Sequence, residues 1–217
     1  RAAKHHNLEA GFDVERIRQD FPILSREVHG KPLVYFDSGA SAQKPRAVID
    51  AMVEVMENEY TNVHRGAHYL SQTLTDRYEG VRETIARFIN AGSENEIVIT
   101  RNTTEAINLV AATYGRKFLS KGDGVVISDM EHHANIVPWQ MLRDEIGIEL
   151  KIAPIDDRGV LDLDAYGDLL DQNTKLVAMT HCSNVLGTVV PAAEIVRMAH
   201  DRGIPVLLDG SQAVVHS

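Results

Sequence analysis

The chain has 217 residues, a formal net charge of −9 and an apolar share of 44%. These values fit a soluble globular protein with a substantial core, and the acidic balance argues against nucleic acid or a membrane surface as a partner. No apolar run approaches the roughly 20 residues that a bilayer-spanning helix needs. Cys182 is the single cysteine, which excludes an internal disulfide and a cysteine-based metal cluster. We therefore expect a cytoplasmic protein without a metal site.

The first part of the chain predicts helices and one strand around short turns. Residues 13–21 can form a short helix that Pro22 ends, because proline restricts the residue that precedes it. An apolar run at residues 33–36 predicts a strand that leads into a turn of small residues. Apolar residues at helical spacing predict a further helix at residues 47–57.

A long amphipathic helix is predicted after the loop H-R-G-A-H, in which Arg65 is either a functional residue or an ordinary solvated charge. The apolar residues of this helix repeat at steps of four and three, which indicates one face packed into a core. Gly92 is expected to end the helix. The residues on the apolar face are Leu74, Tyr78, Val81, Ile85 and Phe88.

Strand and helix patterns alternate in the second half of the chain. The predicted strands are residues 97–99, 125–127, 149–153, 176–179 and 206–208. The predicted helices are residues 103–114, 134–146, 163–170 and 192–200. Strands separated by helices of this length form right-handed βαβ units, so we expect an α/β fold with a mostly parallel sheet and helices on both faces. The glycine-rich nucleotide motifs and the G-x-S-x-G hydrolase motif are missing from this sequence.

Hydroxyl and imidazole side chains follow the first two of these strands. Thr103 and Thr104 open the helix at residues 103–114, where free backbone N–H groups favour a phosphate. The stretch Thr100 to Glu105 around them could instead form an ordinary N-cap. His132 follows the next strand, where its ring could lie flat against a planar ligand or cap the helix that follows.

An amide and a carboxylate follow the last two strands. Asn184 offers both a donor and an acceptor. Asp209, with Gln212 after it, ends an apolar strand, and a buried carboxylate needs a cationic partner such as a protonated heterocyclic nitrogen. Asp209 could equally cap the next turn. Because these positions share one edge of the sheet, together they describe a pocket for pyridoxal phosphate.

Six motifs in a fixed order resemble the Suf-type cysteine desulfurases, which belong to the class V aminotransferase family of fold-type-I pyridoxal phosphate enzymes. The similarity runs from about residue 12 to residue 217, and selenocysteine lyases share much of the pattern. The motifs are D-S-G-A-S-A-Q-K-P, H-R-G-A-H, R-N-T-T-E-A-I-N-L-V, E-H-H-A-N-I-V-P-W-Q, H-C-S-N-V-L-G-T and D-G-S-Q-A-V.

The resemblance implies roles around the cofactor. Thr104 would bind the phosphate, with Thr103 beside it, and His132 would stack on the pyridine ring. Asp209 would pair with the ring nitrogen, and Gln212 would bond to the phenolic oxygen. These five residues are the cofactor-binding residues that we expect, and His132 is also the catalytic candidate.

The resemblance also implies substrate residues and three departures. Asn184 would help to hold the substrate carboxylate, and Arg65 would lie near the pocket. In this family the Schiff-base lysine, the cysteine that receives the sulfur and the arginine that anchors the substrate carboxylate follow Asp209 at greater distances than this chain extends. Cys182 lies in a different motif, so we do not expect it to be the sulfur acceptor.

The implied reaction converts L-cysteine to L-alanine and leaves an enzyme-bound persulfide for iron–sulfur cluster assembly. The alternatives are a selenocysteine lyase or a non-catalytic fragment of such an enzyme. The implied partners are a sulfur-acceptor protein and a second copy of the chain. Since the sequence ends shortly after a strand, we expect residues 31–217 to be the pyridoxal phosphate-binding large domain, incomplete at its C-terminus. Residues 1–30 would belong with the small domain or form a loose end.

Overall fold

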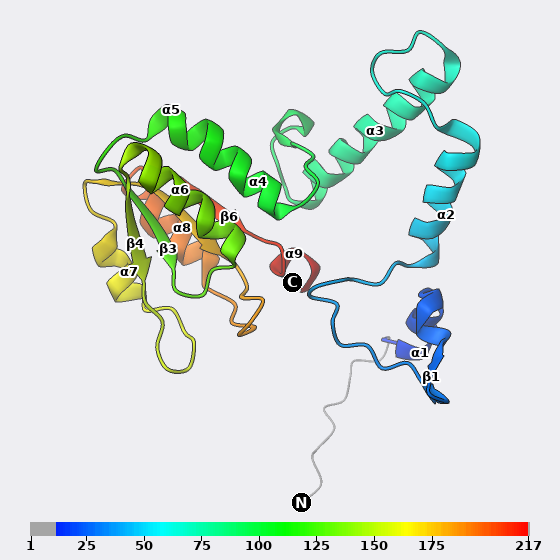
Figure 1. Cartoon of the computed structure of the whole chain (residues 1–217), viewed down its shortest axis with the longest axis horizontal. Helices are drawn as coiled ribbons and strands as arrows, with labels where there is room; N and C mark the ends of the chain where they lie inside the picture. Colours follow the sequence, from blue (N-terminus) through cyan, green and yellow to red (C-terminus); the bar gives the residue numbers. More distant parts are fainter. Residues whose placement is uncertain (1–11, 217) are drawn as a thin grey trace, which may run out of the picture. The chain divides into compact units, whose positions relative to one another are not determined.

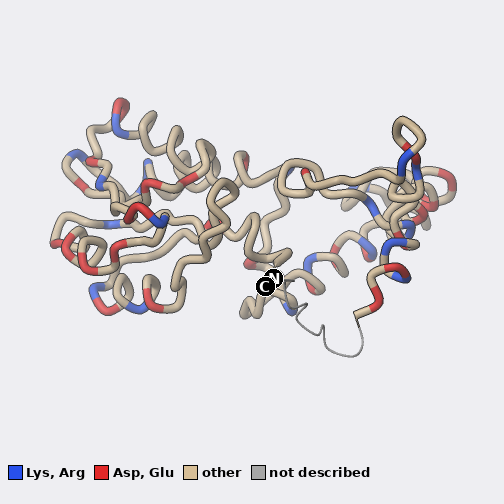
Figure 2. Tube along the Cα trace, turned by 90° about the horizontal axis from the view of Figure 1, so that it is seen from below, with Lys and Arg blue, Asp and Glu red and all other residues tan. Residues whose placement is uncertain are grey.

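The computed structural model describes residues 12–216 of the chain. The contacts within it separate two compact units, and the chain passes from one to the other between Val98 and Ile99; each unit is described by itself. The domain boundary expected at residue 30 stays a prediction, and residues 1–11 lie outside the described part. Basic and acidic residues are interspersed along the trace (Figure 2), so the net charge of −9 is not gathered in one segment. Within the described range, no helix combines the length and hydropathy needed to span a bilayer.

The unit that ends at Val98 begins with short elements. Asp13 caps the first helix by accepting the Arg16 N–H at 3.0 Å, and this helix confirms the first prediction. The elements are α1 (Val14–Gln19), the 3-10 helix η1 (Pro22–Ser25) and the antiparallel strands β1 (Glu27–Val28) and β2 (Lys31–Pro32).

The strand predicted at residues 33–36 is wrong. The chain there pairs with no strand of the described structure, and the side chains of Val34 and Phe36 are 70% and 96% exposed. An apolar run is stable as a strand only where a neighbouring strand and an apolar layer cover it. Neither covers this run within its unit, although the turn of small residues that follows is present at Asp37 to Ser41.

Two longer helices follow in this unit. The predicted helix at residues 47–57 is confirmed by α2 (Arg46–Glu54), which runs on into the π-helical turn η2 (Val55–Glu59). The long amphipathic helix is confirmed by α3 (Tyr69–Phe88). His68 caps α3, because its ring nitrogen Nδ1 accepts the Ser71 N–H at 3.4 Å.

The end and the surroundings of α3 differ from the prediction. Asn90, with φ of 57°, ends the helix before Gly92, and the Ala91 N–H bonds to the Ala86 carbonyl at 2.9 Å. Asparagine tolerates this left-handed backbone better than other residues with a side chain. The apolar face is also not a packed core in this unit, since Phe88 is 69% exposed.

A parallel sheet forms the centre of the second unit (Figure 1). Its strand order is β4-β3-β5-β6, and all three pairings are parallel. This confirms the predicted α/β class. The strands are β3 (Gly124–Ser128), β4 (Glu149–Ala153), β5 (Thr174–Thr180) and β6 (Val206–Asp209).

The strand predicted at residues 97–99 is wrong, since these residues join no ladder. A 3-10 helix, η3 (Glu94–Glu96), precedes them, and Ile97 has extended backbone with φ of −91° and ψ of 117°. The local pattern of residues 97–99 therefore produced an extended chain, whereas a strand also needs a hydrogen-bonded neighbour.

The helices of the second unit match the predictions closely. Residues 103–118 form one continuous helical segment that includes a π-helical turn. The elements are α4 (Thr103–Val110), η4 (Ala111–Gly115), α5 (Arg116–Phe118), η5 (His133–Asn135), α6 (Val137–Ile146), α7 (Leu163–Leu169), α8 (Ala192–His200) and α9 (Ala213–His216).

Alternate side chains of the central strands enter two different cores. In β3, Val125 and Ile127 pack against α4, η4 and α6, whereas Val126 packs against α7 and α8 on the other face. The central strand β5 is divided in the same way. Because helices cover both faces, a ligand of this sheet has to bind at one of its edges.

Tyr166 offers a test of the core beside α7 and α8. Its side chain is fully buried, and its hydroxyl donates to the Ile195 carbonyl at 3.0 Å. Tyr166→Phe is expected to lower the free energy of unfolding by about 1 kcal/mol, the usual net value of one such hydrogen bond. Urea denaturation measures this, with the exposed Tyr60→Phe as the control that should change nothing. An equal effect of both substitutions would contradict the prediction.

The same substitution should also alter the alkaline pH dependence of stability. Burial raises the pKa of Tyr166 from 10.0 to about 12. Above pH 10 the unfolded chain therefore loses this proton first, so the contribution to stability is lost as the pH rises towards 12. Tyr166→Phe should reduce this alkaline loss, which denaturation at several pH values would show.

Candidate active site

Asp209 is a buried carboxylate at the carboxyl end of β6. It is 8% exposed, and its Oδ1 atom accepts both the Ser211 N–H at 3.0 Å and the Ser211 hydroxyl at 2.6 Å. Its backbone carbonyl accepts the His181 N–H at 2.9 Å, which fixes the strand end. No ion pair found among residues 12–216 includes Asp209. A buried carboxylate in this state would be stabilised by a cationic group of a ligand.

A hydroxyl chain connects Asp209 to the beginning of α4. The Oγ1 atom of Thr103 lies 2.8 Å from the Oγ atom of Ser211. Since the Ser211 hydroxyl donates its hydrogen to Asp209, Thr103 is the donor in this bond. The structure thus brings together Thr103 and Asp209, which are far apart in the sequence. The role of Ser211 was not predicted, although a hydroxyl two residues after a carboxylate is a known signal for a local turn.

The N-terminus of α4 is capped by neither threonine. Asn102 is the N-cap, and its Oδ1 atom accepts the Glu105 N–H at 2.9 Å. Thr104 is exposed at this end of the helix. The ordinary N-cap that the stretch Thr100 to Glu105 could form is therefore present at Asn102, and Thr104 remains exposed to a ligand.

His132 lies between β3 and η5 with an exposed ring. Its Nδ1 atom accepts the Ala134 N–H at 3.1 Å, so the side chain caps η5. In a neutral ring the hydrogen is then on Nε2. Capping, which the sequence left open for this residue, is present, and it fixes the ring through one nitrogen.

A buried hydrogen-bond network lies directly beside His132. Glu131 is 9% exposed; its Oε1 atom accepts the Ser128 hydroxyl at 2.5 Å and the Thr180 N–H at 2.9 Å, and its Oε2 atom accepts the Asn135 amide at 2.7 Å. Asn135 in turn accepts the Trp139 indole N–H at 3.0 Å. Burial raises the pKa of Glu131, although these hydrogen bonds oppose the rise. This network was not predicted from the sequence.

The strand register connects this network to Asp209. Thr180, whose N–H bonds to Glu131, is the register partner of Asp209 in the β5–β6 ladder. His132 follows β3 and Asp209 ends β6, and these two strands lie on either side of β5, so both residues lie at the same edge of the sheet. This arrangement is what the alternating pattern predicted for the carboxyl ends of parallel strands.

The remaining predicted site residues are less closely connected. Asn184 is exposed in the turn between the bridged residues Cys182 and Val189, and Gln212 is half-buried just before α9. Arg65 is exposed and belongs to the first unit.

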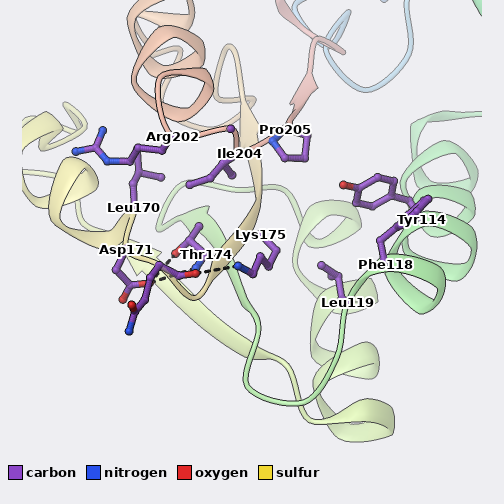
Figure 3. Close-up of a pocket in the computed structure, with 12 residues that line it drawn as sticks. Tyr114, Phe118, Leu119, Leu170, Asp171, Thr174, Lys175, Arg202, Ile204 and Pro205 are labelled. Atoms are coloured by element: carbon purple, nitrogen blue, oxygen red, sulfur yellow. Dashed lines mark hydrogen bonds between the residues drawn. The ribbon is translucent and has the colours of Figure 1, made fainter.

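A cavity of about 510 Å³ lies at the opposite, amino edge of the sheet (Figure 3). Residues just before β5 and β6 line it, together with the aromatic pair Tyr114 and Phe118. Its cationic groups already bond to the chain itself: Lys175 donates to the Gln172 carbonyl at 2.8 Å, and Arg202 donates to a carbonyl of α8 at 3.1 Å. Because this cavity lies at the edge opposite Asp209, it is separate from the candidate site.

Comparisons with known proteins agree with this architecture. The family model for aminotransferase class-V matches residues 34–217. Cysteine desulfurases of Serratia proteamaculans and Yersinia pestis are each 54% identical over 205 residues, or 94% of this chain and 50% of the relative. The chain spans about half the length of the curated relatives it matches.

Solved structures give the same result. The apo structure of a cysteine desulfurase from Thermococcus onnurineus NA1 is 36% identical with a TM-score of 0.84, covering 93% of this chain and 48% of that one. The cysteine desulfurase CsdA from Escherichia coli is 36% identical with a TM-score of 0.82, covering 95% and 51%. Enzymes of the class V family use pyridoxal phosphate, the group that the strand-end residues suggested. The chain belongs to the aminotransferase class-V family.

Proposed function

We propose that this chain is the cofactor-binding part of a Suf-type cysteine desulfurase. The enzyme would convert L-cysteine to L-alanine and pass the sulfur, as an enzyme-bound persulfide, to an acceptor protein for iron–sulfur cluster assembly. The observation that carries the proposal is the hydroxyl chain from Thr103 through Ser211 to Asp209, which joins a helix N-terminus to a buried carboxylate. The cysteine desulfurases at 54% identity support the same activity.

The residues present fit pyridoxal phosphate. Asp209 is buried at a strand end. Both hydrogen bonds from Ser211 reach its Oδ1 atom, and neither involves Oδ2. The N-terminus of α4 and the accessible hydroxyl of Thr104 suit a phosphate. The His132 ring is exposed and oriented through Nδ1, which suits stacking on a flat ring.

Each residue then has a distinct task. Asp209 would keep the ring nitrogen protonated, Gln212 would bond to the phenolic oxygen, and Asn184 would help to hold the substrate carboxylate. When bound, pyridoxal phosphate would delocalise the negative charge that develops on the substrate. Cys182 is half-buried in its turn, with Sγ 3.9 Å from the Gly187 carbonyl, and we assign it no part in sulfur transfer.

Titration with pyridoxal phosphate tests this proposal. The chain should bind the cofactor at one site, seen as a change in its absorbance, and borohydride should not fix it covalently, since no lysine follows Asp209 in this sequence. The full-length protein should release alanine from L-cysteine faster than from other amino acids. Faster turnover of L-selenocysteine would favour the lyase, and cofactor binding without turnover by the full-length protein would favour a non-catalytic role.

His132 provides a prediction that separates stacking from capping. His132→Ala removes both the ring and the cap of η5, whereas His132→Asn removes the ring but keeps an oxygen that can accept the Ala134 N–H. Both variants should bind pyridoxal phosphate about fivefold more weakly, because an aromatic contact is worth about 1 kcal/mol. Only His132→Ala should lose stability. Wild-type affinity of His132→Asn for pyridoxal phosphate would mean that His132 only caps η5 and does not stack on the cofactor.

The cellular setting follows from the same proposal. A reaction that supplies sulfur for iron–sulfur clusters needs free thiols, which suits the cytoplasm and a chain with a single cysteine. We expect the full-length enzyme to be a homodimer and to meet a separate sulfur-acceptor protein. Sedimentation of the full-length enzyme with and without its acceptor would test both expectations.

A further inference from the structure

The loop that carries His132 is held by its neighbour, Glu131. The two consecutive side chains point in different directions, since Glu131 is buried and His132 is exposed. The carboxylate of Glu131 bonds to β3 through Ser128, to η5 through Asn135 and to β5 through the Thr180 backbone. One buried group therefore joins the loop to two strands at the edge where His132 lies.

The direction of three hydrogen bonds in this network is fixed. The indole N–H of Trp139 can only donate, so the Asn135 oxygen has to accept it and the Asn135 amide has to donate to Glu131. The Thr180 N–H also only donates. The side chain at position 131 must consequently accept hydrogen bonds at both of its terminal atoms, which a carboxylate does and an amide does not.

We infer that Glu131 is a positioning residue, which holds the His132 ring at the carboxyl edge of the sheet through the backbone of the loop. This inference rests on the proposed function, in which His132 stacks on the cofactor. Glu131 itself is buried, and the groups that its carboxylate bonds all belong to the chain. Its effect on the cofactor is therefore expressed only through the placement of His132.

A swap of two side chains tests the inference with little change in volume. In Glu131→Gln the new amide opposes the Asn135 amide, so two donors face each other and the network breaks. In the double variant Glu131→Gln/Asn135→Asp the amide of residue 131 can donate to the new carboxylate, which also accepts the Trp139 N–H. The double variant should thus restore the network that each single substitution breaks.

Two measurements follow the loop without any cofactor. The Ala134 N–H bonds to Nδ1 of His132, so its hydrogen exchange reports where the His132 ring is held. Its protection should fall about tenfold in Glu131→Gln and return to within about threefold of wild type in the double variant. Trp139 is the single tryptophan of the chain, and its fluorescence should change and recover in parallel.

The third measurement is the dissociation constant for pyridoxal phosphate. It should rise about tenfold in Glu131→Gln and recover in the double variant. Tyr166→Phe, which weakens the opposite face of the sheet, is the control for destabilisation alone and should leave the constant unchanged. A dissociation constant that changes in Glu131→Gln but not in Tyr166→Phe could then not be explained by a loss of stability.

The outcomes separate this inference from the proposed function. Unchanged protection of the Ala134 N–H in Glu131→Gln overturns the inference about Glu131. A loss of this protection that the double variant fails to restore overturns it too. An equal loss of cofactor affinity in Tyr166→Phe overturns it as well. If the wild-type chain binds no pyridoxal phosphate, the proposed function fails, whereas hydrogen exchange still decides whether Glu131 holds His132.

Discussion

Asp209→Asn is expected to lower the turnover of L-cysteine by the full-length enzyme about 100-fold or more, while the fold is kept. The amide has nearly the same shape as the carboxylate and can still accept the two bonds from Ser211. It carries no charge, however, so it cannot keep a ring nitrogen protonated. Alanine release under saturating cofactor measures the effect, and the circular dichroism spectrum checks the fold.

The matched control is Asp157→Asn, an exposed carboxylate in the loop after β4. It removes the same charge from the chain, so it separates the local role of Asp209 from a change in net charge. Turnover should stay at the wild-type level in this control. Rates for Asp209→Asn within about threefold of wild type would remove Asp209 from the cofactor site, and with it the central residue of the proposed function.

Met179→Ala is expected to cause the largest loss of stability among these substitutions, between about 2 and 5 kcal/mol. Met179 is fully buried in the central strand β5, where it packs in the same core as Tyr166 and Ile195. Truncation would leave a cavity between the sheet and α8 that the rigid strand cannot close. Urea denaturation should show a lower midpoint with an unchanged slope.

Met141→Ala is the control for this experiment. Met141 is 61% exposed on α6, so the same chemical change creates no cavity there. Alanine also has a slightly higher helix propensity than methionine, so the free energy of unfolding should stay the same or rise slightly. Similar losses in both variants would mean that the core beside α8 is not packed as described.

Local sequence patterns predicted the βαβ half of the chain well. The predicted helix at residues 192–200 and strand at residues 149–153 have the observed bounds. Their apolar residues recur at a period that only one type of element can bury on one side, so the local pattern was sufficient. The runs at residues 33–36 and 97–99 carried an equally good strand pattern, but neither is paired in the structure.

The candidate site was predicted only in part. The position of Asp209 at the end of an apolar strand was visible in the sequence, and the structure has it there. The hydrogen bonds that orient Asp209 were not visible in the sequence, because Thr103 and Ser211 come from distant segments. Glu131 appeared in a motif, yet its burial depends on Thr180 of another strand.

The sequence by itself determined the order of elements and the residue type at each strand end. These depend on periodicity and on the chemistry of neighbouring residues, which are local properties. The tertiary structure alone decided which hydroxyl reaches Asp209, which carboxylate is buried beside His132, and which apolar runs become strands. Each of these depends on a partner from a distant part of the chain, and a hydrogen bond or a strand pairing forms only when folding brings that partner within reach.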